Sequence, residues 1–254
     1  MTSSVIAAQM YTLRQFTQDA ESMAKAMQKV KELGYEAVQL SGHGPIEPQE
    51  IRKMLDDTGL TVVITHTPWE RIKNDTVAVI QEHKLWQCEY VALGSMPPEY
   101  RNLAGFHRFA AEVSEVAKKL ADNGLRFAYH NHSFEFEKFN RKTGMEILCS
   151  ETDPELVSIE VDTYWVQHGG GDPAQWIRDL KGRVQVVHLK DMVIQEGKQI
   201  FAEVGEGNMN WPGILKACEE AGTEWYVVEQ DICQRDPFES LAISLSNLHK
   251  LGLK

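Results

Sequence analysis

Residues 157–163 read Val-Ser-Ile-Glu-Val-Asp-Thr, an apolar run that carries two carboxylates, Glu160 and Asp162, at its end. Runs dominated by Val and Ile are typical of parallel strands that are buried on both faces. A buried carboxylate is stable only when it is paired, hydrogen-bonded or bound to a metal. This stretch therefore predicts a parallel sheet whose strand ends hold functional groups.

Similar apolar runs recur along the chain and alternate with amphipathic stretches that are typical of helices. The predicted strands are Val5–Tyr11, Val38–Gly42, Thr61–Thr67, Tyr90–Gly94, Arg126–His132, Val157–Thr163, Val184–Asp191 and Glu224–Asp231. Gly59 and Gly222 follow two of the amphipathic stretches, where glycine commonly ends a helix. Asp172–Pro173 and Asp236–Pro237 open two others, with a capping Asp before a Pro at the first helical position. The alternation predicts either a doubly wound sheet or a barrel.

The distribution of polar residues favours the barrel. No Gly-x-Gly-x-x-Gly run follows the first strand, and polar residues end many different strands. A doubly wound sheet gathers its ligand contacts at one switch point, whereas a barrel collects them from all around its rim. The length of 254 residues matches the roughly 250 that such barrels usually have. We therefore predict an α/β fold, a single (β/α)8 TIM-barrel domain over residues 1–254.

Composition narrows the classes of partner and compartment. The formal net charge of −11 disfavours nucleic acid as a partner, because phosphate binding needs clustered Lys and Arg. The four cysteines form no Cys-x-x-Cys pair, which favours reduced thiols in a cytoplasmic protein. No stretch approaches the roughly 18 apolar residues of a membrane span, so we expect no membrane association.

Carboxylates and one histidine occur at the ends of the last four predicted strands. The fifth strand leads into Tyr-His-Asn-His-Ser-Phe-Glu-Phe-Glu at residues 129–137, and the next three end near Asp162, His188 and Glu229. At the mouth of a barrel these carboxylates would repel one another without a cation between them. Carboxylate-rich ligation with one imidazole suits Mn²⁺, Mg²⁺ or Co²⁺ better than a structural zinc site. The pattern predicts one divalent metal ion, with Mn²⁺ favoured and Zn²⁺ also allowed.

The runs YHNHSFEF, EVDTYW, VVHLKDM, FAEVGEGNMNW and WYVVEQD resemble the xylose-isomerase-like TIM-barrel superfamily of sugar phosphate isomerases and epimerases. That superfamily also contains ketose 3-epimerases, inosose dehydratase and endonuclease IV. The resemblance covers essentially the whole chain and is strongest from Tyr129 to Asp231. It implies a metal held by Glu, Asp, His and Glu, of which the last three correspond to Asp162, His188 and Glu229.

The first glutamate is a departure from the superfamily pattern. Many relatives carry Glu-Asn-His at the end of the fifth strand, where this chain has His130-Asn131-His132. Glu135 and Glu137 are the nearest carboxylates, and their spacing of two cannot distinguish them, because both would face the same way on an extended segment. We take Glu135, which lies nearer the strand end, and keep His130 as the alternative ligand.

The resemblance implies an isomerase or epimerase that acts on a sugar or keto-sugar through an enediolate. Glu135 and Glu229 would then be both ligands and the acid/base pair, and a homodimer is expected. The residues expected to contact a sugar or polyol substrate are His66, Trp69, His130, His132, Lys190 and Glu206.

Three other functions remain open. A dehydratase of a keto-inositol or 3-keto-glycoside would share the first step and use one of the histidines as a general acid. A metal-free barrel could serve as a binding or partner subunit. An endonuclease would need more metal ligands and a basic surface, which the charge of −11 disfavours.

Overall fold

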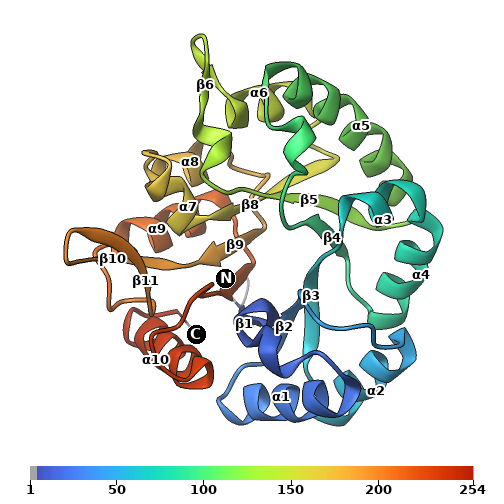
Figure 1. The fold of residues 1–254 in the computed structure, drawn as a ribbon, viewed down its shortest axis with the longest axis vertical. Coiled ribbons are helices and arrows are strands. Elements are labelled where there is room, and N and C mark those ends of the chain that lie inside the picture. Colours follow the sequence, from blue (N-terminus) through green and yellow to red (C-terminus); the bar gives the residue numbers. More distant parts are fainter. Residues whose placement is uncertain (1–4, 254) are drawn as a thin grey trace.

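Eight short strands pair in parallel and close into a barrel, with helices around its outside (Figure 1). The computed structural model describes residues 5–253. Around the barrel the order is β1-β12-β9-β8-β5-β4-β3-β2. Each barrel strand therefore pairs with the next barrel strand along the chain, and β12 pairs with β1 to close the barrel. This arrangement confirms the predicted (β/α)8 fold. The barrel strands are β1 Val5–Gln9, β2 Ala37–Leu40, β3 Thr61–His66, β4 Tyr90–Leu93, β5 Arg126–His130, β8 Val157–Asp162, β9 Val186–Leu189 and β12 Trp225–Val228.

The helices follow the capping signals of the sequence. Asp172 and Asp236 accept hydrogen bonds from the first backbone N–H groups of α8 and α10, as predicted. Gly59 and Gly222 adopt left-handed conformations, with φ of 68° and 83°, and end α2 and α9. The helices are α1 Ala20–Glu32, α2 Pro48–Thr58, α3 Trp69–Asn74, α4 Thr76–Trp86, α5 Leu103–Ala121, α6 Gly144–Glu151, α7 Thr163–His168, α8 Pro173–Asp179, α9 Trp211–Ala221 and α10 Pro237–Lys250.

Several short elements at the strand ends were not predicted. The first strand stops at Gln9, whose side chain accepts a hydrogen bond from the Tyr11 N–H and opens the 3-10 helix η1 (Met10–Phe16). Two hairpins, β6–β7 (Lys138–Phe139 and Lys142–Thr143) and β10–β11 (Asp191–Gln195 and Lys198–Ala202), extend the loops after β5 and β9. The 3-10 helix η2 (Pro98–Tyr100) lies in the loop after β4, and η3 (Phe134–Phe136) lies in the loop after β5. Such elements depend on local turn geometry rather than on a repeating apolar pattern.

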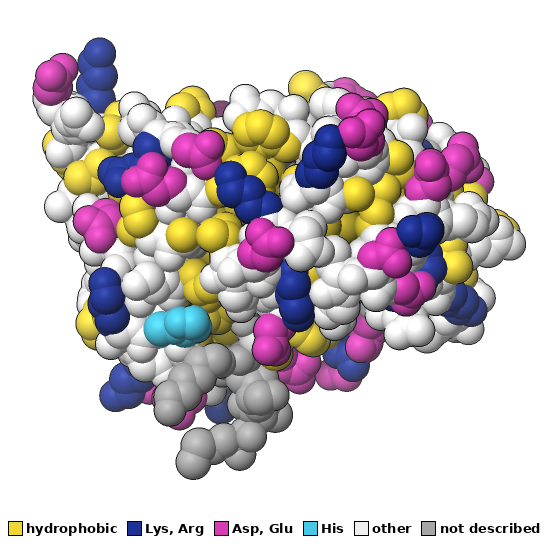
Figure 2. All heavy atoms as spheres, turned by 90° about the horizontal axis from the view of Figure 1, so that it is seen from below, with side chains coloured by type: hydrophobic (Ala, Val, Ile, Leu, Met, Phe, Trp, Pro, Cys, Tyr) yellow, Lys and Arg dark blue, Asp and Glu magenta, His cyan; other side chains and the backbone are white. Residues whose placement is uncertain are grey.

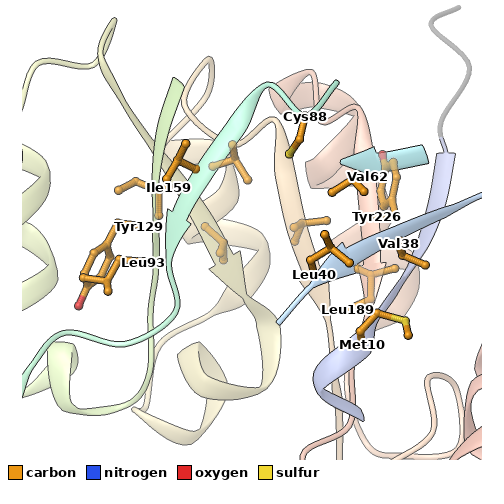
Figure 3. Close-up of a cluster of buried hydrophobic side chains, with 14 of the residues drawn as sticks. Met10, Val38, Leu40, Val62, Cys88, Leu93, Tyr129, Ile159, Leu189 and Tyr226 are labelled. Carbon is orange, nitrogen blue, oxygen red and sulfur yellow. The ribbon is translucent and has the colours of Figure 1, made fainter. Parts of the chain in front are cut away.

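Two hydrophobic clusters divide the strand residues by the side of the barrel that they face. Outward residues such as Val38, Ile159 and Leu189 pack in the larger cluster (Figure 3). This cluster also contains helix residues. The smaller cluster contains strand residues alone and includes Ala7 and Ala128. Because successive residues of a strand point to opposite faces, the smaller cluster fills the interior of the barrel. Polar side chains at the same inward parity lie beyond it, at the carboxyl ends of the strands.

The surface carries charges of both signs. Figure 2 shows Lys and Arg side chains interspersed with Asp and Glu over the face seen from below. Within residues 5–253, no helix is both long enough and apolar enough to cross a membrane.

Asp191 holds together the loop that follows β9. Its carboxylate accepts hydrogen bonds from the backbone N–H groups of Gly205 and Gly207, at 2.9 and 3.1 Å, and from the Trp211 indole at 2.6 Å. Asp191 is buried, and it also accepts from the Met192 N–H. One carboxylate therefore ties the β10–β11 hairpin to the start of α9.

We predict that Asp191→Ala lowers the free energy of unfolding by at least about 2 kcal/mol, because buried N–H donors lose a charged acceptor. Urea denaturation followed by circular dichroism measures this. Asp57→Ala, which breaks an exposed pair with Lys53, is the control and should change the free energy by less than about 0.5 kcal/mol. Equal effects of the two substitutions would contradict the role given to Asp191.

Candidate metal centre and active site

Four side chains meet at the carboxyl ends of four adjacent strands. His130 ends β5, Asp162 ends β8, His188 lies in β9 and Glu229 follows β12. One ligand atom from each of the four lies within 4.8 Å of the others, and all four residues are buried. His188 Nδ1 lies 2.9 Å from Glu229 Oε2 and 3.7 Å from Asp162 Oδ2, and His130 Nε2 lies 3.2 Å from Asp162 Oδ2. The parallel register brings these residues together, because it aligns the ends of neighbouring strands.

In His130 and His188, one ring nitrogen points toward Asp162 and Glu229, and we call it the inner nitrogen. The other, the outer nitrogen, faces an oxygen acceptor. His188 Nε2 lies 2.6 Å from Gln39 Oε1 and 2.9 Å from Glu160 Oε1. His130 Nδ1 lies 2.9 Å from the carbonyl oxygen of Gly94. These contacts fit a proton on the outer nitrogen of each ring, which leaves the inner nitrogen facing the carboxylates, as in metal-binding histidines.

The two carboxylates and two imidazoles lie so close together that positive charge between them stabilises the arrangement. Burial lowers the pKa of His188, but the carboxylates of Glu160 and Glu229 outweigh it and hold that pKa well above its ordinary value. The inner nitrogen thus attracts either a proton or a metal ion. Two imidazole nitrogens and two carboxylate oxygens form a donor set that fits a divalent ion such as Mn²⁺, Co²⁺ or Zn²⁺.

Glu160 contacts His188 from deeper inside the barrel. It was not among the predicted site residues. Its two oxygens lie 2.9 Å from His188 Nε2 and 2.8 Å from His66 Nε2, and its side chain is fully buried. The attraction of the two rings outweighs the effect of burial and lowers the pKa of Glu160 well below its ordinary value. A sequence signal for Glu160 did exist, because it lies two residues before Asp162 and must face the same side of the strand.

Lys190 contributes a buried ammonium to the same group. Its Nζ lies 2.8 Å from Asp162 Oδ2, 2.7 Å from Glu229 Oε2 and 2.9 Å from Asp231 Oδ2. Burial would raise the pKa values of Asp162 and Glu229, but the ammonium holds both below their ordinary values. Both carboxylates are therefore charged at neutral pH.

The structure does not bring Glu135 into this group. Its carboxylate accepts a 2.6 Å hydrogen bond from the Tyr129 hydroxyl and a 2.9 Å bond from the His132 N–H. Tyr129 faces the outer hydrophobic cluster, and η3 turns Glu135 back toward it. Burial raises the pKa of Glu135 to about 7. At the end of β5 the side chain that points into the barrel is that of His130, the alternative ligand.

A cavity of about 520 Å³ opens above the group. Of the predicted substrate contacts, His66, Trp69, His130 and His132 line it, together with Glu229 and Asp231. Lys190 lies beneath the lining, in contact with the last two. Burial lowers the pKa of His132 to about 2, so this imidazole is neutral.

Glu206 lies away from this cavity. Its carboxylate accepts a 2.8 Å hydrogen bond from Asn247 on α10 and borders a separate groove with Arg235 and Lys250. The loop that carries Glu206 is held by Asp191, which accepts hydrogen bonds from the N–H groups of the residues on both sides of Glu206.

Comparison with known proteins finds a family match for most of the chain. The model of the xylose isomerase-like TIM barrel family matches residues 27–245. An inosose dehydratase from Geobacillus thermodenitrificans is 29% identical over 147 residues, which cover 50% of this chain and 48% of that protein. The chain thus spans about half the length of the curated relatives it matches.

Solved structures agree with the fold. A sugar phosphate isomerase/epimerase from Parabacteroides distasonis has a TM-score of 0.81 at 24% identity, over 98% of this chain and 94% of that chain. An L-ribulose 3-epimerase has a TM-score of 0.74 at 14% identity, over 98% of this chain and 94% of that chain. At these identities the likeness is one of fold.

We predict that His130→Ala weakens Mn²⁺ binding at least about 10-fold, because it removes a donor from the group. Glu135→Gln should change the affinity less than about 2-fold, because its carboxylate lies behind the strand and outside the group. Isothermal titration calorimetry on both variants and the wild type measures the two affinities. A stronger effect of Glu135→Gln than of His130→Ala would restore Glu135 as the ligand.

Proposed function

Because the chain belongs to the xylose isomerase-like TIM barrel family, we propose that it is a metal-dependent isomerase or epimerase of a keto-sugar or related polyol. The observation that carries this proposal is the convergence of two inward imidazole nitrogens and two charged carboxylates beneath an open cavity. In this proposal His130, Asp162, His188 and Glu229 hold one divalent ion, with Mn²⁺ favoured. When bound, the ion supplies Lewis-acid stabilisation of the oxygen charge that develops during enolisation.

Glu229 is the residue best placed to move the substrate proton. Its carboxylate lines the cavity and is charged at neutral pH, the form in which a carboxylate accepts a proton. A carboxylate that accepts the proton next to a carbonyl and returns it to another carbon or face completes an isomerisation or epimerisation.

On the other side of the cavity floor, His66 and Ser41 can exchange protons with substrate hydroxyl groups. The Ser41 hydroxyl lies 3.3 Å from His66 Nδ1, and Glu160 fixes the opposite ring nitrogen. Both Ser41 and His66 line the cavity.

The charge of the cavity favours an unphosphorylated substrate. Among the described residues its lining contains the carboxylates of Glu70, Glu229 and Asp231 and no Lys or Arg side chain. Phosphate groups are bound by Arg, Lys or helix N-termini, and carboxylates repel them. The apolar wall formed by Trp69, Leu93 and Pro97 suits the C–H face of a neutral sugar ring.

A dehydratase is the second candidate, and the position of Glu135 favours it. With Glu135 behind the strand, only one of the two predicted acid/base glutamates remains at the cavity. Loss of water after enolisation needs one base and one acid, which Glu229 and His66 can supply. The similarity to an inosose dehydratase is consistent with this outcome.

We predict that Glu229→Gln lowers kcat by about 10²- to 10⁴-fold, because the general base is removed. Removal of divalent metal by a chelator should abolish the activity, and Mn²⁺ should restore it. A panel of ketoses and keto-inositols in D₂O, followed by NMR, measures both effects and separates deuterated isomers from dehydrated products. Glu206→Gln, outside the cavity, is the control and should retain activity. Metal-independent turnover would overturn the proposal.

We further predict that the unphosphorylated form of an accepted ketose has a kcat/KM at least about 10-fold above that of its phosphate ester, because the cavity carboxylates repel the phosphate. Paired steady-state assays at constant ionic strength test this. A preference for the ester would show that a cation outside the described lining enters the site.

A further inference from the structure

Lys190 contacts the same oxygen atoms that face the two imidazoles. Its Nζ binds Asp162 Oδ2 and Glu229 Oε2, which are also the oxygens nearest His130 Nε2 and His188 Nδ1. The other oxygen of Asp162, Oδ1, points away from this group and caps α7 by accepting a hydrogen bond from the Trp165 N–H. The Lys190 side chain is only 1% exposed, so water does not compete for its ammonium.

An ammonium in this position and a metal ion on these oxygens conflict. Carboxylate oxygens bind such ions at about 2.1 Å, so an ion on Asp162 Oδ2 would lie within about 5 Å of Nζ where it now stands. Like charges at that separation in a buried site repel each other strongly. The two cations also draw on the lone pairs of the same two oxygens.

The Asp231 carboxylate can keep the Lys190 ammonium paired when a metal ion occupies Asp162 and Glu229. Its carboxylate lies 2.9 Å from Nζ, is 24% exposed and lines the cavity. The rings of Trp165 and Phe201 have their centroids 5.7 and 5.8 Å from Nζ and can stabilise the ammonium by cation–π attraction. Lys190 can therefore leave Asp162 and Glu229 without losing every partner.

We propose that Lys190 is an internal cation that competes with the divalent ion for Asp162 and Glu229, and that metal binding transfers its ammonium to Asp231 at the cavity. This inference rests on the metal site of the proposed function. In the metal-free protein Lys190 neutralises the buried carboxylates and stabilises the fold. In the metal-bound protein its ammonium pairs with Asp231 at the cavity wall.

The first test compares Mn²⁺ binding by Lys190→Met and by the wild type, using isothermal titration calorimetry at one pH. Loss of the competing ammonium should tighten binding at least about 10-fold and lower the thermal midpoint of the metal-free protein. Lys119→Gln, on the exposed face of α5, is the matched control and should leave both unchanged. Unchanged or weaker binding by Lys190→Met overturns the inference. Absence of Mn²⁺ binding by the wild type overturns the proposed function as well.

The second test needs no variant at Lys190. The wild-type protein is treated briefly with acetic anhydride, with and without saturating Mn²⁺, and acetylation is quantified by mass spectrometry. Acetylation of Lys190 relative to Lys119 should rise at least about 3-fold with Mn²⁺, because the amine then faces the cavity instead of lying buried. Equal or lower acetylation of Lys190 in the Mn²⁺-bound protein overturns the transfer.

Discussion

Buried carboxylates at the carboxyl ends of the strands are the feature on which the rest of the site depends. Glu160, Asp162 and Glu229 are almost fully buried and lie within one small volume around His188. Carboxylates in such a place are stable only when cations and hydrogen-bond donors surround them. The imidazoles of His66, His130 and His188 and the ammonium of Lys190 supply that surrounding. The positions of these imidazoles and of the ammonium at the mouth therefore follow from the charge of the buried carboxylates.

Small side chains inside the barrel leave room for the buried carboxylates, imidazoles and ammonium at its mouth. Small residues such as Ala7, Ala37, Ala92 and Ala128 occupy the interior below it, at positions of the same inward parity. Gly94 continues this pattern at the end of β4, because a Cβ there would lie 2.7 Å from His66 Nδ1. Its carbonyl oxygen at the same time orients His130. Close approach of strand and ring thus fixes the direction in which each imidazole presents its inner nitrogen.

His130 in place of a glutamate changes the chemistry that the site can support. In the proposed site His130 is a neutral donor in place of a negative one, and Glu229 is the glutamate of the four-residue group. A second imidazole shifts the preference of the donor set from Mg²⁺ toward Mn²⁺, Co²⁺ and Zn²⁺. In the proposed function, one carboxylate base therefore works with an imidazole or hydroxyl partner. The chain therefore combines the barrel of its family with a group of two imidazoles and two carboxylates at the mouth.

The sequence by itself determined the eight strands and the strand ends that carry Asp162, His188 and Glu229. Apolar runs and capping residues are local signals, and parallel pairing brings successive strand ends to one rim. Only the tertiary structure placed His130 inside the group and Glu135 behind the strand, because the path of the chain after β5 depends on the η3 turn and on the hydroxyl of Tyr129. It also decided that Glu206 faces α10 and that Lys190 reaches Asp231. These contacts join residues that are distant in sequence, and no periodic pattern encodes the direction of a side chain in a loop.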